Sequence, residues 1–266
     1  MEVIPITEWH RYESRLVGPC ERILELLDLY GSRATFFVLG YVAEKFPQLI
    51  RRIAENHEVA THGYDHQLIY RQPPDLYRKM LRRSIQAVQD IAGKPVLGHR
   101  APFFSVTSHS RWALDIMAEL GLVYDSSIFP VFNYRYGIPG AQRHASILKL
   151  SGGRRLLEIP MATVRRSGLN IPMAGGAYLR IYPGWVIPWG IRRMNAEGLP
   201  AVIYIHPWEL DPGHPRPALP WRIRVTHYHN LNKTEERLVR LLREFRFGPM
   251  CEVFSREVEQ VQKQQP

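Results

Sequence analysis

The stretch that decides the fold is "GPCERILELLDLYGSRATFFVLG", residues 18–40, in which an amphipathic run is followed at once by a short apolar run. The apolar residues of the first part recur at helical spacing and stop at Gly31, which predicts a helix. The second part, "ATFFVLG", is short, aromatic and β-branched, which predicts a buried strand. A helix followed directly by a buried strand is typical of α/β proteins.

The same step repeats along the first half of the chain. Further strands are expected at residues 58–62, 95–100 and 122–127, preceded by helices at residues 47–57, 73–93 and 107–121, the last with Ser/Thr caps. The repeat of roughly thirty residues is that of parallel βαβ units. We therefore expect an α/β fold whose chemistry lies at the carboxyl ends of parallel strands.

The second half of the chain has a looser pattern. "GGAYLRIYP" (residues 175–183) predicts a glycine-rich turn, and "GWVIPWGIRRMNAEG" (residues 184–198) predicts a helix interrupted by proline. "AVIYI" (residues 201–205) predicts a strand, and "TEERLVRLLREFRF" (residues 234–247) a final helix capped by Thr234.

Composition limits the class of protein. The 266 residues suit one large domain, and the charged residues among the first thirty argue against a signal peptide. No stretch reaches the length of an apolar membrane span, so we expect a soluble, cytoplasmic protein. Cys20 and Cys251 are the only cysteines, so neither a disulfide framework nor a thiolate zinc site is supported.

The net charge of +10 raises the question of an anionic partner. Its densest group is Arg78, Lys79, Arg82 and Arg83 on one predicted helix, which is typical of a solvated helix face. No nucleic-acid motif accompanies the charge, so we expect no nucleic-acid partner. An acidic polysaccharide and peripheral association with a membrane both stay open, and nothing indicates a protein partner.

Four polar residues lie at the carboxyl ends of predicted strands: His62, Arg100, Asp125 and His206. His66 lies four residues after His62, and two imidazoles at this spacing are either metal ligands or capping and buried polar residues. We expect the loops at one rim of the fold to bring all five side chains together. Taken singly, Arg100 could cap a strand end, Asp125 could cap a turn or helix, and His206 could simply end a strand.

These residues lie in a familiar set of motifs. "THGYDH", "RAPFF", "YDSS" and "YIHPWEL" resemble, in order and spacing, motifs two to five of the polysaccharide deacetylases of carbohydrate esterase family 4, the NodB-homology domain. "ATFFVLG", "YDSSIFP", "HPWELDP" and "FRFGPM" are similar to the subgroup encoded in exopolysaccharide and exosortase-linked gene clusters. The resemblance implies a distorted (β/α)7-type barrel over residues 1–210, with a subgroup-specific extension at residues 211–266 packing on it.

The resemblance also implies a reaction, the hydrolysis of N-acetyl groups from amino sugars of a bacterial exopolysaccharide or its precursor. His62 and His66 match two ligands of a divalent metal, zinc in most relatives, and other nitrogen-loving metals would also be accepted. His206 matches the general acid, and Asp125 would hold its imidazole. Arg100 matches an arginine that pairs with the catalytic base.

Exposed aromatic residues could form a sugar-binding groove, although most aromatic residues of such a chain belong to its core. We assign Phe103 and Trp208 to the groove.

One expected motif is absent. Family members open with a strand that ends in a pair of aspartates, a base and a third metal ligand, whereas this chain begins "MEVIPITEWHRYESR". We expect the opening strand to be missing from this chain, with the coding sequence extending upstream of Met1. Two alternatives to an active deacetylase follow: a catalytically inactive carbohydrate-binding member of the family, or a barrel amidohydrolase acting on a small cyclic amide.

Overall fold

The computed structural model describes residues 6–133, 136–216 and 221–264. The chain divides into two compact units, which we call the sheet unit and the hairpin unit. The sheet unit comprises residues 33–161 and 248–264, and the hairpin unit comprises residues 6–32 and 162–247, as far as these are described. The boundary predicted at residue 210 stays a prediction.

The sheet unit contains a six-stranded sheet with the order β1-β2-β3-β4-β6-β5. Its strands are β1 (Thr35–Val38), β2 (Glu58–Thr61), β3 (Gly98–His99), β4 (Tyr124–Asp125), β5 (Ser146–Lys149) and β6 (Arg155–Glu158). The strands β1 to β4 and β6 are parallel, and β5 is antiparallel to β6. Successive strands lie side by side, which is the winding of a barrel wall and not of a doubly wound sheet. The predicted α/β class with a parallel sheet is confirmed.

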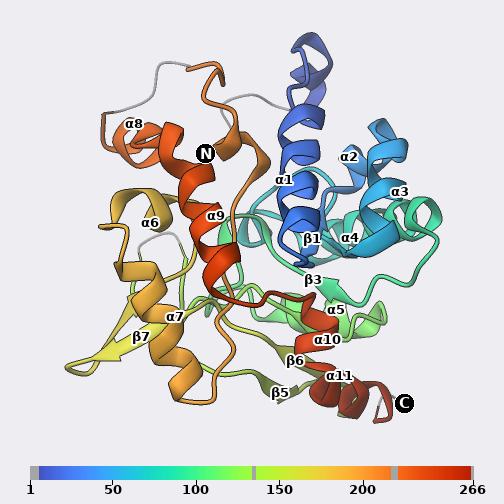
Figure 1. The fold of residues 1–266 in the computed structure, drawn as a ribbon. Helices are drawn as coiled ribbons and strands as arrows, with labels where there is room; N and C mark the ends of the chain where they lie inside the picture. The colour runs from blue at the N-terminus through green and yellow to red at the C-terminus, as the bar shows by residue number, and fades with distance from the viewer. Residues whose placement is uncertain (1–5, 134–135, 217–220, 265–266) are drawn as a thin grey trace. The chain divides into compact units, whose positions relative to one another are not determined.

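Helices connect the strands of this unit (Figure 1). They are α2 (Gly40–Lys45), α3 (Pro47–Asn56), α4 (Pro74–Ala92) and α5 (Trp112–Glu119), followed at the end of the chain by α10 (Met250–Val253) and α11 (Ser255–Gln262). The longest helix, α4, packs on α2, α3 and α5 and against β2. Its bounds follow from local signals, because Pro74 occupies the first turn and Gly93 ends the helix at φ 65°.

Two strands are shorter than predicted, since β3 and β4 have two residues each. They come close together at Gly98, where an added Cβ would lie 1.9 Å from the Tyr124 ring. The edge strand β1 also differs from the expected buried strand, because only Val38 of its four residues is fully buried. Within the described sheet β1 pairs with β2 alone, which explains this partial exposure.

Caps also differ from the prediction. Ser110 does not cap α5, because its hydroxyl accepts the backbone N–H of Thr107 at 2.9 Å and donates to the Ser105 carbonyl at 2.7 Å. Thr234 is the first residue of α9 and not its cap, because a short 3-10 helix runs directly into α9 there.

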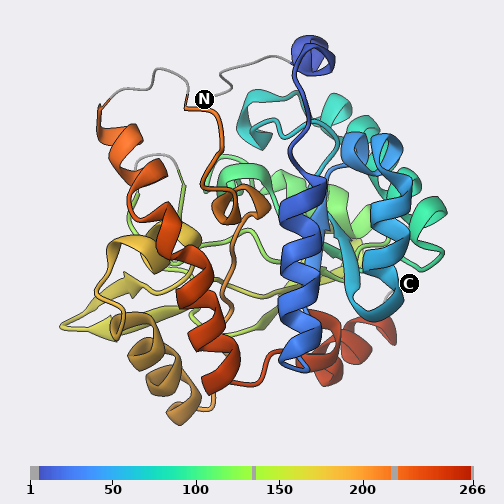
Figure 2. The same ribbon diagram turned by 45° about the horizontal axis from the view of Figure 1, so that its top comes forward.

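The hairpin unit contains the antiparallel pair β7 (Thr163–Arg166) and β8 (Leu169–Pro172) together with most of the later helices. The α-helices are α1 (Val17–Leu29), α6 (Gly176–Ile181), α7 (Val186–Ala196), α8 (Trp221–Tyr228) and α9 (Thr234–Glu244), and the 3-10 helices include η5 (Pro207–Leu210) and η6 (Leu231–Lys233). Within this unit α9 packs on α6, and α7 packs on β7 (Figure 2).

Several predictions for this unit are wrong. Pro188 lies in the first turn of α7, where a missing N–H costs nothing, so it does not interrupt the helix. Residues 201–205 belong to no strand, against the prediction. The β7–β8 hairpin was missed, although the dipeptide Ser167-Gly168 favours a turn. Both residues have positive φ, at 49° and 81°.

Cys20 and Cys251 are free thiols. Among the described helices, none combines the length and the apolar character that a membrane crossing requires.

Candidate active site

The first histidine of the predicted pair has a fixed tautomer. His62 directly follows β2, and its backbone N–H donates to the Val38 carbonyl at 2.8 Å. Its ring nitrogen Nδ1 lies 2.6 Å from the carbonyl oxygen of Arg100. Because a carbonyl can only accept, Nδ1 must carry the proton, and the lone pair is left on Nε2. That is the state in which an imidazole binds a metal.

His66 lies beside His62 on a tightly folded loop. The two ring centroids are 5.1 Å apart with an interplanar angle of 60°. His66 has φ 62°, a left-handed conformation that is uncommon outside glycine. Ser84 on α4 holds the start of this loop. Its hydroxyl donates to the Gly63 carbonyl at 2.7 Å and lies 2.8 Å from the Thr61 hydroxyl. Strain of this kind is characteristic of functional sites.

Phe103 lies at the same place. Its ring is 4.9 Å from that of His66, it is 39% exposed, and it also has a positive φ of 53°. A large apolar ring held in an unfavourable backbone conformation and turned partly to solvent is consistent with the predicted contact to a sugar.

Arg100 is buried and contacts the loop after β4. Its Nε donates to the Ser126 carbonyl at 3.1 Å, and its Nη2 donates to the Ser126 hydroxyl at 2.9 Å. The guanidinium carbon also lies 4.2 Å from the centre of the Phe37 ring on β1. Its predicted pairing with a catalytic base stays a prediction.

Asp125 is fully buried and holds a histidine that the motif analysis did not single out. Its Oδ1 accepts from His99 Nδ1 at 2.8 Å and from the Ser127 hydroxyl at 2.6 Å. Glu158 lies opposite Asp125 in the β4–β6 register. Burial, followed by the charge of Asp125, raises the pKa of Glu158 well above its ordinary value. The predicted contact of Asp125 with His206 stays a prediction.

His206 belongs to the hairpin unit, where it comes just before η5. Its Nδ1 lies 2.7 Å from Glu209 Oε1, and the same oxygen accepts the backbone N–H of His206 at 3.1 Å. Glu209 is 1% exposed, whereas the His206 side chain is 47% exposed. Arg180 on α6 donates from Nε to Glu209 Oε2 at 3.0 Å. The histidine therefore presents an accessible ring above a buried ion pair.

Trp208 stacks on protein rather than standing free. Its ring lies 4.1 Å from that of His227 at an angle of 14°, and the Arg180 guanidinium is 5.4 Å from its centre. Burial, followed by the charge of Arg180, lowers the pKa of His227 to about 4, so this ring is neutral at physiological pH. One face of Trp208 is thus covered by His227, which limits the predicted sugar contact to the remaining face and edge.

The structure brings part of the predicted constellation together. Within the sheet unit, His62, His66, Arg100 and Phe103 are linked by direct contacts, and Asp125 is buried one strand away. His206 and Trp208 lie in the hairpin unit, so their predicted placement beside the paired imidazoles stays a prediction.

Three functional candidates were missed. Glu209 carried a local signal, the three-residue spacing of a capping box after His206. Arg180 and Glu158 carried none, because their partners are distant in the sequence.

The metal site is only partly formed by the residues described. His62 and His66 offer two nitrogen ligands, but the described part of the chain holds no group of three His, Cys, Asp or Glu side chains placed to bind an ion. Three protein ligands are usual for catalytic zinc. The pair could therefore supply part of a coordination sphere.

Two family models match consecutive parts of this chain. Residues 17–124 match the family model described as polysaccharide deacetylase, and residues 126–255 match a domain of unknown function, DUF3473. Residues 17–124 of this chain therefore belong to the polysaccharide deacetylase family. Membership in the exopolysaccharide subgroup stays a prediction.

Curated relatives of this chain carry deacetylase names. The peptidoglycan-N-acetylglucosamine deacetylase of Bacillus cereus is 32% identical over 96 residues, which are 35% of each chain. The chitooligosaccharide deacetylase of Bradyrhizobium is 33% identical over 99 residues, 36% of this chain and 42% of that protein. The peptidoglycan deacetylase of Helicobacter pylori is 28% identical over 108 residues, 40% of this chain and 36% of that protein. The chain thus spans well under half the length of these relatives.

Solved structures share the fold of this family member. A probable polysaccharide deacetylase from Pseudomonas aeruginosa PAO1 aligns with a TM-score of 0.62 and 16% identity, covering 94% of this chain and 75% of that one. Puue allantoinase aligns with a TM-score of 0.61 and 16% identity, covering 90% and 71%.

Proposed function

We propose that this chain hydrolyses the N-acetyl group of amino sugars in a polysaccharide. The observation that carries the proposal is the hydrogen bond from His62 Nδ1 to the Arg100 carbonyl, which places the lone pair of the ring on Nε2, with the His66 ring centroid 5.1 Å from that of His62. The family membership supports the same reaction, since its named relatives are deacetylases.

The proposal gives each residue a task. His62 and His66 would hold a divalent ion, zinc in our expectation, which when bound supplies polarisation of the acetyl carbonyl. Phe103 would orient the sugar ring beside them. His206 would donate a proton to the nitrogen as the carbon–nitrogen bond breaks, because an unprotonated amide nitrogen is a very poor leaving group.

Measurement of acetate release tests the proposal. The full chain is incubated with N-acetylglucosamine oligomers and with peptidoglycan, in the presence of zinc or cobalt. We expect acetate from the wild type and from a His109→Ala control, which removes an exposed histidine that has no proposed role, but strongly reduced release from His62→Ala and His206→Ala. Binding of the oligomers without acetate release by the wild type would overturn the proposal in favour of an inactive binding protein. Turnover of cyclic ureides alone would favour the amidohydrolase.

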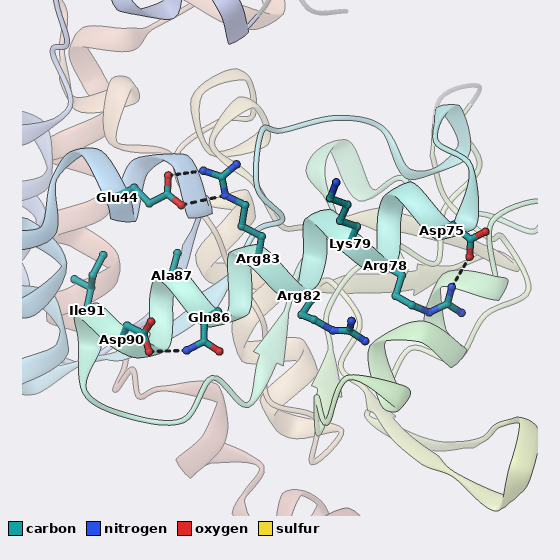
Figure 3. A pocket seen from close by; sticks show the side chains of 10 residues that line it. All are labelled: Glu44, Asp75, Arg78, Lys79, Arg82, Arg83, Gln86, Ala87, Asp90 and Ile91. Atoms are coloured by element: carbon teal, nitrogen blue, oxygen red, sulfur yellow. Dashed lines mark hydrogen bonds and ion pairs between the residues drawn. The ribbon is translucent and has the colours of Figure 1, made fainter.

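An exopolysaccharide precursor is our proposed substrate, on the basis of the subgroup motifs, and the cytoplasmic face of a membrane our proposed place of action. The outer face of α4 supports the second point (Figure 3). A groove of about 770 Å³ runs along it. Arg78 pairs with Asp75 and Arg83 with Glu44, whereas Lys79 and Arg82 have no partner among the described residues. Co-sedimentation with anionic vesicles, lost in a Lys79→Gln/Arg82→Gln variant, would test this.

A further inference from the structure

We infer that Glu209, held in turn by Arg180, is the positioning residue of His206, so that the proton leaves from Nε2 of the imidazole and never from Nδ1. The inference rests on the proposed function in that His206 is taken as the general acid. It assigns to Glu209 the role that the motif analysis gave to Asp125.

The geometry around His206 fixes the side of the ring that can act. Both N–H groups on the inner side of the residue, the backbone N–H and Nδ1–H, point to Glu209 Oε1 at 3.1 and 2.7 Å. The inner side is therefore fully occupied by one oxygen. Nε2 is the other ring nitrogen, and the His206 side chain is 47% exposed. Only this nitrogen can reach a substrate.

Glu209 is itself held rigidly. Its Oε2 accepts from Arg180 Nε at 3.0 Å, and Arg180 Nη1 donates to the carbonyls of His227 and His229 at 2.7 and 3.1 Å. The side chains of Arg180 and Glu209 are 2% and 1% exposed. The carboxylate also lies against Gly176, where an added Cβ would be 1.6 Å from Oε2. A residue with this many constraints cannot turn away from His206 without disrupting the unit.

The charge of the carboxylate is maintained as well as its position. Burial alone would raise the pKa of Glu209, but the hydrogen bond and charge of His206 and the Arg180 guanidinium together hold it below the ordinary value. Glu209 is therefore ionised throughout the neutral range. A buried carboxylate on Nδ1 both stabilises a positively charged ring and selects the Nδ1–H tautomer when the ring is neutral.

The proton transfer then has a defined direction. The Nε2–H bond breaks and a new N–H bond forms on the leaving nitrogen, which keeps the electron pair of the broken carbon–nitrogen bond. His206 is left neutral with its proton on Nδ1, still donating to Glu209. Among the described residues, the aromatic rings near His206 are those of Tyr204 at 5.5 Å and Trp208 at 6.1 Å, and His214 and His227 lie beyond Trp208.

The tautomer of His206 provides a test that needs no turnover. In the full chain labelled with ¹⁵N-histidine, we expect NMR at pH 8 to show His206 as the Nδ1–H tautomer. Glu209→Gln should abolish this preference, because a single amide oxygen cannot accept from three N–H donors that arrive at both carboxylate oxygens. The Asp211→Asn control removes a carboxylate from the same segment that pairs with Arg15, and should leave the tautomer unchanged. An unchanged tautomer in Glu209→Gln would overturn the inference.

Kinetics provide the second arm. In Glu209→Gln we expect kcat to fall at least about 10-fold with KM nearly unchanged, and the alkaline limb of the pH–rate profile to move to lower pH. A proportional loss at every pH would indicate a merely structural role and overturn the inference. If the single variant does not fold, the Arg180→Gln/Glu209→Gln pair removes both buried charges, and the same tautomer change is expected. If the wild type releases no acetate, the proposed function fails, but the NMR result still decides the role of Glu209.

Discussion

His62 and His206 are held through the same ring atom by two different acceptors. His62 Nδ1 contacts the backbone carbonyl of Arg100 at 2.6 Å, and His206 Nδ1 contacts the carboxylate of Glu209 at 2.7 Å. A neutral carbonyl fixes the tautomer without stabilising a positive ring, as suits a metal ligand. A carboxylate does both, as suits an acid. The difference indicates that the acceptor at Nδ1 suits His62 to bind a metal and His206 to donate a proton.

The largest effect that could break this comparison is expected at His206. In His206→Ala we expect kcat for acetate release to fall by about 10²- to 10⁴-fold, because the leaving nitrogen loses its proton donor. Zinc affinity, measured by calorimetry, should be that of the wild type. A matching loss of zinc affinity would mean that His206 is a ligand, and the two histidines would no longer differ in role.

The next effect concerns His62. In His62→Ala we expect zinc affinity to fall by at least about 10-fold. Loss of a residue that only hydrogen-bonds to a metal ligand already costs about that much, and loss of the ligand itself should cost no less. Cobalt absorption spectra of the wild type, His62→Ala and the exposed His109→Ala control measure this. Unaltered spectra in His62→Ala would show that His62 is not a metal ligand.

A third histidine sharpens the comparison through its buried carboxylates. Asp125 accepts a hydrogen bond from His99 Nδ1. Burial and the neighbouring charge of Asp125 raise the pKa of Glu158. The folded protein therefore keeps a proton on Glu158 that the unfolded chain releases above about pH 4.5. The stability contributed by this proton is full below that pH and is lost as the pH rises toward the raised folded value. The slope is about 1.4 kcal/mol per pH unit.

Glu158→Gln imitates the protonated acid and keeps an acceptor for the Ile128 N–H. We expect the variant to flatten the dependence of unfolding free energy on pH above 4.5, as measured by urea denaturation at several pH values. Parallel curves for variant and wild type would show that Glu158 is ionised in the fold.

The smallest effect is expected at Phe103, beside His66. Phe103→Asn removes the ring but suits the left-handed backbone, which asparagine tolerates better than phenylalanine. We expect KM for oligosaccharides to rise by about 2- to 10-fold, the worth of a single aromatic contact, with kcat and melting temperature retained. A fall in kcat with constant KM would instead place Phe103 in the support of the histidine loop.

The sequence predicts what local signals determine. The limits of α4 follow from Pro74 and Gly93, and the ends of β2 and β4 place His62 and Asp125 correctly. The tautomer of His62 could not be predicted, because it depends on a carbonyl 38 residues away in sequence. The ion pair between Arg180 and Glu209 spans 29 residues and leaves no periodic trace. Contacts between segments distant in sequence determine the chemistry of each imidazole. Local sequence signals determine only its position relative to a strand or helix end.

Gly176 gives one more consequence. No side chain fits there without displacing the Glu209 carboxylate, although the residue itself carries no functional group. In a saturation mutagenesis screen scored by acetate release, position 176 should thus be as intolerant as a catalytic position. A reader of such a map would mark it as part of the reaction centre, when its contribution is an empty volume.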